Sequence, residues 1–154
     1  MSDQAAGLRA RLSPDAVPLR VIGEPGDDAL MQALAMMPTR ASHGWRVLRQ
    51  GERTAGKVAW LAWLDAEQLD VPDLYRRLKL AQAEQGPAGP VLLWLYDGRR
   101  QGLPQSADAA TDRLIDNLGV TVERFLGFAL TRDVGRWYRG VTATRCQLSS
   151  AVGQ

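Results

Sequence analysis

The sequence predicts a single α+β domain in which helices flank a mostly antiparallel sheet. A chain of 154 residues with 45% hydrophobic content is large enough for one compact domain with a buried core. Apolar runs of strand length alternate along the chain with segments of helical periodicity. Two β-rich runs flank a short polar turn, which predicts a β-hairpin. We expect this domain over residues 18–148, after a loosely ordered lead-in, 1–17, and before a frayed tail, 149–154.

The first half of the chain is expected to form a strand, a helix and the hairpin. Asp27 or Asp28 can cap the helix, and Pro38 ends it. The turn GERTAG joins the two hairpin strands, of which the second is apolar on both faces and should lie inside the sheet. The length of the segment AWLAWLDAEQL also allows a helix there, so the strand has a competing interpretation.

The second half is expected to alternate helices and strands. Pro72 suits the first turn of a helix, and Asp65, Glu67 and Asp70 before it are interpreted as capping residues rather than metal ligands. Ser106 is the expected cap of the next helix, and Gly119 its expected end. The whole order is β-α-β-β-α-β-α-β-β, with strands at 18–24, 45–50, 57–64, 91–96, 120–130 and 136–148 and helices at 27–37, 70–86 and 106–119.

Composition limits the possible functions. Seventeen of the nineteen basic residues are arginines, yet the net charge is only +2. From Arg99 onward, eight arginines face five acids, a mild preference for anions that disfavours a nucleic-acid binding arm. One cysteine, Cys146, and one histidine, His43, cannot build a structural zinc site, so we expect no metal. The chain shows neither an apolar leader nor an apolar span of about 18 residues, so we expect a cytoplasmic protein with no membrane partner.

The stretch VLLWLYDGRRQGLP is the strongest candidate for a ligand site. A buried strand leads through Gly98 and Gly102 toward a helix, so that backbone N–H groups and two arginines can converge on an anion. The same pattern also occurs in ordinary strand-to-helix loops, and Pro104 removes one N–H donor. An anion site and a polar loop both remain possible interpretations of this stretch.

The run RVLRQGERTAGKVAWLAWL resembles the central hairpin of the GNAT acyltransferase superfamily. In that family a later R/Q-x-x-G-x-G/A motif binds the pyrophosphate of acyl-CoA. Arg99 and Gly102 match this motif, whereas Pro104 departs from it. The resemblance implies that backbone groups of Arg99, Arg100, Gln101, Gly102 and Leu103 hold the cofactor, that the strand around Trp94 holds its pantetheine arm, and that Tyr138 protonates the leaving thiolate.

The helix between the hairpin and the aromatic strand is similar to a divergent branch of that family, the toxin-activating lysine acyltransferases. The branch uses a histidine and an aspartate, for which the nearest equivalents are His43 and Asp97. The resemblance therefore implies an acyl-CoA-dependent acyltransferase with His43 or Asp97 as general base. The alternative is a non-catalytic bacterial interaction domain (an adaptor, chaperone or assembly factor) that binds a protein partner through exposed Trp and Arg residues. Whether the chain is an enzyme stays open at this point.

Overall fold

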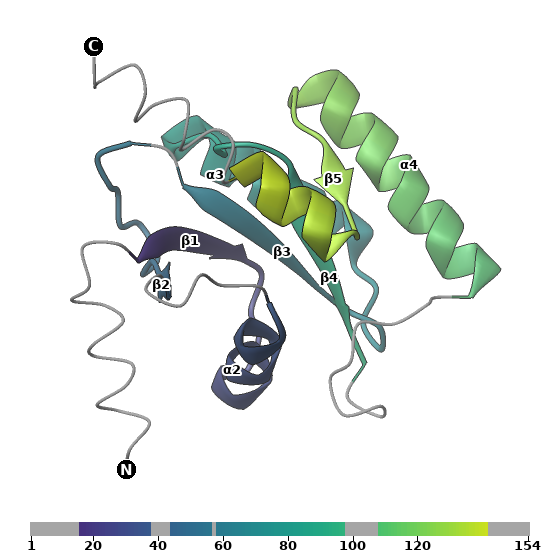
Figure 1. Ribbon diagram of the computed structural model, residues 1–154. Coiled ribbons are helices and arrows are strands. Elements are labelled where there is room, and N and C mark those ends of the chain that lie inside the picture. The colour runs from purple at the N-terminus through teal and green to yellow at the C-terminus, as the bar shows by residue number, and fades with distance from the viewer. Residues whose placement is uncertain (1–15, 38–43, 57, 98–107, 142–154) are drawn as a thin grey trace.

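The computed structural model describes residues 16–37, 44–56, 58–97 and 108–141, which form a five-stranded sheet with helices on both faces (Figure 1). In chain order the elements are β1 (Val17–Ile22), α2 (Asp27–Met36), β2 (Trp45–Val47), β3 (Ala59–Asp65), α3 (Val71–Glu84), β4 (Val91–Tyr96), α4 (Ala109–Phe125) and β5 (Leu130–Thr131). A last described helix follows at 134–141, here called the final helix. The mixture of helices and strands expected from the sequence is confirmed.

The sheet has the order β2-β1-β3-β4-β5, and all of its strand pairs are parallel. The prediction of a mostly antiparallel sheet is therefore wrong. The predicted hairpin is also wrong, because β1 lies between the two runs: Leu19 pairs with Val47 on one side and with Ala59 on the other. The connection from β2 to β3 therefore does not close a hairpin but carries the chain back across β1. Two consecutive parallel strands of one sheet can be joined only by such a crossover connection.

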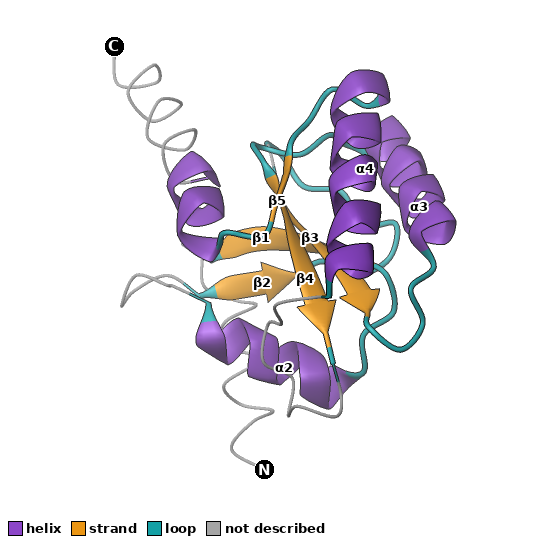
Figure 2. Ribbon diagram, turned by 90° about the vertical axis from the view of Figure 1, so that its right-hand side faces the viewer, coloured by secondary structure: helices purple, strands orange, loops and turns teal. Residues whose placement is uncertain are grey.

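Helices cover both faces of the sheet (Figure 2). The chain moves from β1 outward to β2, and later from β3 in the opposite direction to β4 and β5. α2 lies on one face and α3 and α4 lie on the other, which is the arrangement expected when crossovers of one hand run in opposite directions. The core accordingly has two clusters. Leu74, Leu78, Ile115 and Leu118 lie in the cluster beneath α3 and α4, whereas Ala33 and Trp137 lie in the cluster beneath α2 and the final helix.

Burial on both faces explains the composition of the central strands. Six consecutive residues of β3, from Ala59 to Leu64, are buried, and so are the first five of β4. Such unbroken apolar runs are typical of a parallel sheet covered on both sides. Of the two interpretations of AWLAWLDAEQL, the strand is confirmed.

Two strands predicted near the C-terminal end are wrong over part of their length. Residues 120–125 continue α4, because Ile115, Leu118 and Val122 form one buried stripe at helical spacing that runs past Gly119. Residues 136–141 lie in the final helix. The N-cap of α4 is Asp108, whose carboxylate accepts the N–H of Thr111 at 2.7 Å, whereas Ser106 lies outside the described residues. None of the described helices has the length and apolarity needed to cross a membrane.

Candidate functional site

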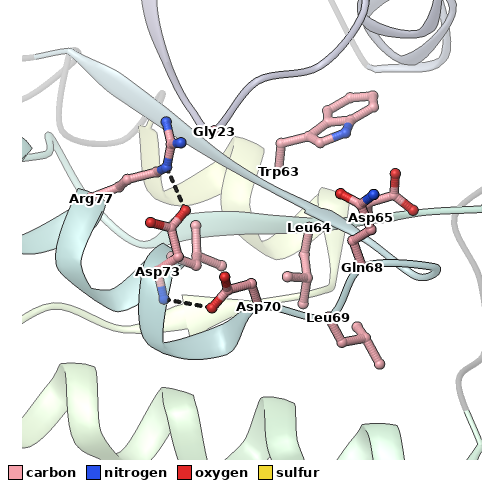
Figure 3. Close-up of a pocket in the computed structure, with 10 residues that line it drawn as sticks. Gly23, Trp63, Leu64, Asp65, Gln68, Leu69, Asp70, Asp73 and Arg77 are labelled. Carbon is pink, nitrogen blue, oxygen red and sulfur yellow. Dashed lines mark hydrogen bonds and ion pairs between the residues drawn. The ribbon is translucent and has the colours of Figure 1, made fainter.

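The chain order of the strands reverses between β1 and β3, where α2 and α3 leave toward opposite faces of the sheet. In doubly wound parallel sheets, ligands bind in the crevice outside the carboxyl ends of the two strands at such a point. Here a cleft of about 540 Å³ occupies this position (Figure 3). It is lined by Gly23, Trp63, Leu64, Asp65, Gln68, Leu69, Asp70, Asp73, Leu74 and Arg77, and we call it the switch-point cleft.

Gly23 brings the end of β1 against β3 at one wall of this cleft. Its φ of 120° lies in a region that side chains with a Cβ rarely adopt. A Cβ added there would lie 3.0 Å from the carbonyl oxygen of Trp63 and 3.2 Å from its Cβ. Only glycine therefore allows the two strands to approach this closely at the cleft. Gly23 was not among the predicted site residues, although a glycine directly after an apolar strand is a usable signal in the sequence.

The connection from β3 to α3 is held in place by two carboxylates. Oδ1 of Asp65 accepts the N–H of Glu67 at 2.8 Å, and Oδ1 of Asp70 accepts the N–H of Asp73 at 3.0 Å. Asp70 is thus the N-cap of α3, with Pro72 in the first turn, and the capping interpretation of this segment is confirmed. Each of these caps uses one oxygen of its carboxylate.

An ion-pair chain ties α3 to the connection that follows β1. Oδ2 of Asp73 accepts from Nε of Arg77 at 2.7 Å, and the Arg76 guanidinium donates to Oδ1 of the same carboxylate. Nη2 of Arg77 lies 3.5 Å from Oε1 of Glu24. The hydrogen bond from Arg77, with a smaller contribution from Arg76, lowers the pKa of Asp73. The same bond raises the pKa of Arg77, so the pair stays ionised.

Among the described residues that line the cleft, the charges are therefore mostly negative. Three carboxylates, those of Asp65, Asp70 and Asp73, face one guanidinium, that of Arg77. That guanidinium is already engaged by Asp73 and Glu24. Figure 3 shows Asp70, Asp73 and Arg77 together on one side of the cleft, while the Trp63 ring points away from them. Among the charged side chains of the described lining, carboxylate acceptors thus outnumber guanidinium donors.

The structure does not bring together the two predicted catalytic residues that it describes. Asp97 directly follows β4 at the carboxyl end of the sheet, where Tyr96 pairs with Asp65. The Tyr138 ring lies 6.4 Å from that of Trp45, which begins β2 at the other end. The strand register places the level of Asp97 and the level of Trp45 roughly eight residues apart along the strands. At ~3.3 Å per residue, this corresponds to about 26 Å.

The remaining predicted site residues divide into one buried side chain and a group that is not described. Trp94 lies in the interior of β4, 2% exposed, with its ring in the core cluster beneath α2 and the final helix. His43 and the predicted pyrophosphate loop, Arg99, Arg100, Gln101, Gly102 and Leu103, lie outside the described residues. The predicted acyl-CoA site therefore stays a prediction.

The tryptophans that were predicted to form a partner surface are not exposed. All five indoles are buried, with at most 9% exposed, so they contribute to the core and not to a docking face: Trp45, Trp60, Trp63, Trp94 and Trp137. Large apolar side chains that are exposed include Met31 on α2, Leu80 on α3 and Phe125 on α4. They are distributed over three helices.

Comparisons of this chain with protein-family models, with curated proteins and with solved structures gave no match.

Proposed function

We propose that this protein is a binding domain that holds a small ligand with positively charged amino groups in the switch-point cleft. The observation that carries the proposal is the position of an acceptor-rich cleft at the reversal between β1 and β3. This is the place where doubly wound sheets bind their ligands. The volume of about 540 Å³ lies within the range of small-molecule sites, roughly 300–1,000 Å³.

The chemistry of the lining residues selects the charge of the ligand. Asp65 and Asp70 each use one oxygen as a cap, and the other oxygen remains for a donor from the ligand. Ammonium groups supply such donors together with a compensating charge. A linear polyamine meets both requirements and fits an open cleft, so it is the class of ligand that we propose.

An anionic ligand is less compatible with this cleft. The N–H groups at the start of a helix often bind phosphate. At α3, however, the Asp70 carboxylate already accepts the N–H of Asp73, and Asp73 adds a second negative charge in the first turn. A phosphate placed here would meet two carboxylates at close range, which opposes its binding.

The test is a calorimetric titration of the protein with spermidine at low ionic strength. The double variant Asp65→Asn/Asp70→Asn keeps an acceptor oxygen for each backbone N–H and removes both charges, since asparagine caps helices about as well as aspartate. We expect spermidine to bind the wild type and the double variant to bind it at least about tenfold more weakly, the equivalent of ~1.4 kcal/mol.

Asp108→Asn is the matched control, because Asp108 caps α4 in the same way as Asp70 caps α3 but does not line the cleft. It should leave spermidine affinity unchanged. Equal affinities of the wild type and the double variant would contradict the proposal, and so would a wild type that does not bind spermidine at all.

A further inference from the structure

A second pocket lies beside the edge of the sheet, beneath the connection from β2 to β3. It has a volume of about 610 Å³ and is lined by Arg46, Val47, Arg49, Gln50, Gly51 and Glu52; we call it the arginine pocket. None of the described residues lines both this pocket and the switch-point cleft. Any ligand that binds here is therefore independent of the function proposed above.

The arginines that line this pocket come from β2 and from the connection to β3, whose described residues, 48–56 and 58, contain no helix. Leu48 and Val58, at its two ends, lie in the core cluster beneath α3 and α4, so the connection runs along that face. Side chains alternate between the faces of a strand. Since Leu19 and Val47 belong to the opposite cluster, the neighbouring Arg20 of β1 and Arg46 of β2 lie on the face that the connection covers.

Three arginines meet one acidic residue at this place. Nη1 of Arg46 lies 2.6 Å from Oε2 of Glu52, and the backbone N–H of Arg49 donates to Oε1 of the same carboxylate at 3.0 Å. The Arg20 guanidinium donates to the backbone carbonyl of Glu52. The side chains of Arg20, Arg46 and Arg49 thus carry three positive charges against the single negative charge of Glu52.

Arg20 is a buried charged side chain with an unsatisfied hydrogen-bond donor. It is 6% exposed, and within the described part of the chain its guanidinium bonds only to a neutral carbonyl oxygen. Its Nε is buried and has no hydrogen-bond partner. Buried charges in proteins are normally paired with an opposite charge. Among the residues that the structure describes, Arg20 therefore has no counterion, and it contacts Glu52 in the wall of a pocket large enough to hold one.

We propose that the arginine pocket binds a small molecule that carries a phosphate group. The planar guanidinium groups of Arg46 and Arg49 can donate two parallel hydrogen bonds to phosphate oxygens, and the negative charge compensates that of Arg20. A volume of about 610 Å³ exceeds what inorganic phosphate occupies, so the ligand is a phosphate monoester of about the size of a mononucleotide.

The test measures the thermal stabilisation and the binding isotherm of the protein with inorganic phosphate, AMP and adenosine, with sodium chloride added to match ionic strength. We expect AMP to bind more tightly than inorganic phosphate and adenosine not to bind. The Arg46→Gln/Arg49→Gln variant should lose at least about tenfold in AMP affinity, and Arg49→Gln alone, at an exposed side chain, should show part of this loss without a risk to folding. Arg113→Gln, at an exposed arginine of α4, is the matched control and should bind AMP as the wild type does.

Two further variants separate a ligand site from a structural cluster. Glu52→Gln keeps the acceptor for Arg46 and Arg49 but removes the competing negative charge, so AMP should bind more tightly. Arg20→Met removes the buried charge, so the ligand-free melting temperature should be at least that of the wild type, while the increase caused by AMP should shrink. Unchanged AMP affinity in Arg46→Gln/Arg49→Gln, or weaker AMP binding by Glu52→Gln, would overturn the site. Equal affinities for AMP and inorganic phosphate would overturn the monoester.

Discussion

Gly23 decides how closely β1 and β3 approach each other at the switch-point cleft. Its positive φ and the 3.0 Å distance from an added Cβ to the carbonyl of Trp63 both disfavour any residue other than glycine at this position. Gly23→Ala should therefore lower the free energy of unfolding by about 1–3 kcal/mol. Urea denaturation of the variant and the wild type measures this difference.

Gly86→Ala is the control for that measurement. Gly86 is exposed, has no positive φ, and has no atom near an added Cβ. The substitution should be neutral or slightly stabilising, because alanine reduces the freedom of the unfolded chain. Equal losses for the two glycines would show that the close approach at Gly23 does not limit the fold.

Single residues also show where sequence reasoning succeeds. The capping role of Asp70 depends on its position just before Pro72 and the apolar stripe of α3, which is local information. The lack of a counterion at Arg20 depends on which segment crosses its face of the sheet. No pattern within β1 contains that information, so the arginine pocket could not be predicted from the sequence.

At the scale of elements, most helices and strands were predictable, but their partners were not. The apolar runs that became β3 and β4 show strands in the sequence, and their burial on both faces already favoured a parallel sheet. The hairpin was wrong because two nearby β-rich runs were assumed to pair with each other. In the fold they both pair with β1, an earlier strand, and local pattern does not determine such a choice.

The final helix shows tertiary packing overriding local propensity. Its β-rich sequence predicted a strand, yet Trp137 and Val141, four residues apart, are both buried in the cluster that it shares with α2. Trp137 stacks on Trp45 of β2 with 5.1 Å between ring centroids. The helix therefore packs on the same face of the sheet as α2.

Removal of that indole should destabilise the whole domain. Because Trp137 is 0% exposed, Trp137→Ala should cost about 3–5 kcal/mol through lost burial and the cavity it leaves. Trp137→Phe keeps an aromatic ring against Trp45 and should cost less. Chemical denaturation followed by circular dichroism gives both values. A cost below about 1 kcal/mol for Trp137→Ala would show that the final helix does not dock as described.

At the scale of the whole molecule, a nearly balanced net charge conceals two regions of opposite sign. The net charge is +2, but the switch-point cleft carries mostly carboxylates and the arginine pocket mostly guanidinium groups. The net charge of the chain does not show this separation of charge, because the two regions form only when the chain folds and the strands pair. This explains why the sequence suggested a mild anion preference but not an acidic cleft.

The acyl-CoA hypothesis also depends on how the whole chain folds. Its hairpin is absent from the sheet, and its cofactor loop lies outside the described residues. The hypothesis still requires that millimolar acetyl-CoA raise the melting temperature, since a ligand of the folded state stabilises that state by RT ln(1 + [L]/Kd). It also requires that Arg100→Glu abolish this increase. The partner hypothesis requires a partner that binds without these indoles, because all five are buried.

The most direct test of the central claim is a two-dimensional ¹⁵N–¹H NMR titration of the protein with spermidine. The proposed cleft predicts that the largest saturable shifts occur at the backbone amides of Gly23, Asp65, Gln68 and Asp70. The amides around Asp108, at the start of α4, should stay in place. Shifts that spread evenly over all acidic residues, or that centre away from the carboxyl ends of β1 and β3, would contradict a binding site at the reversal of strand order.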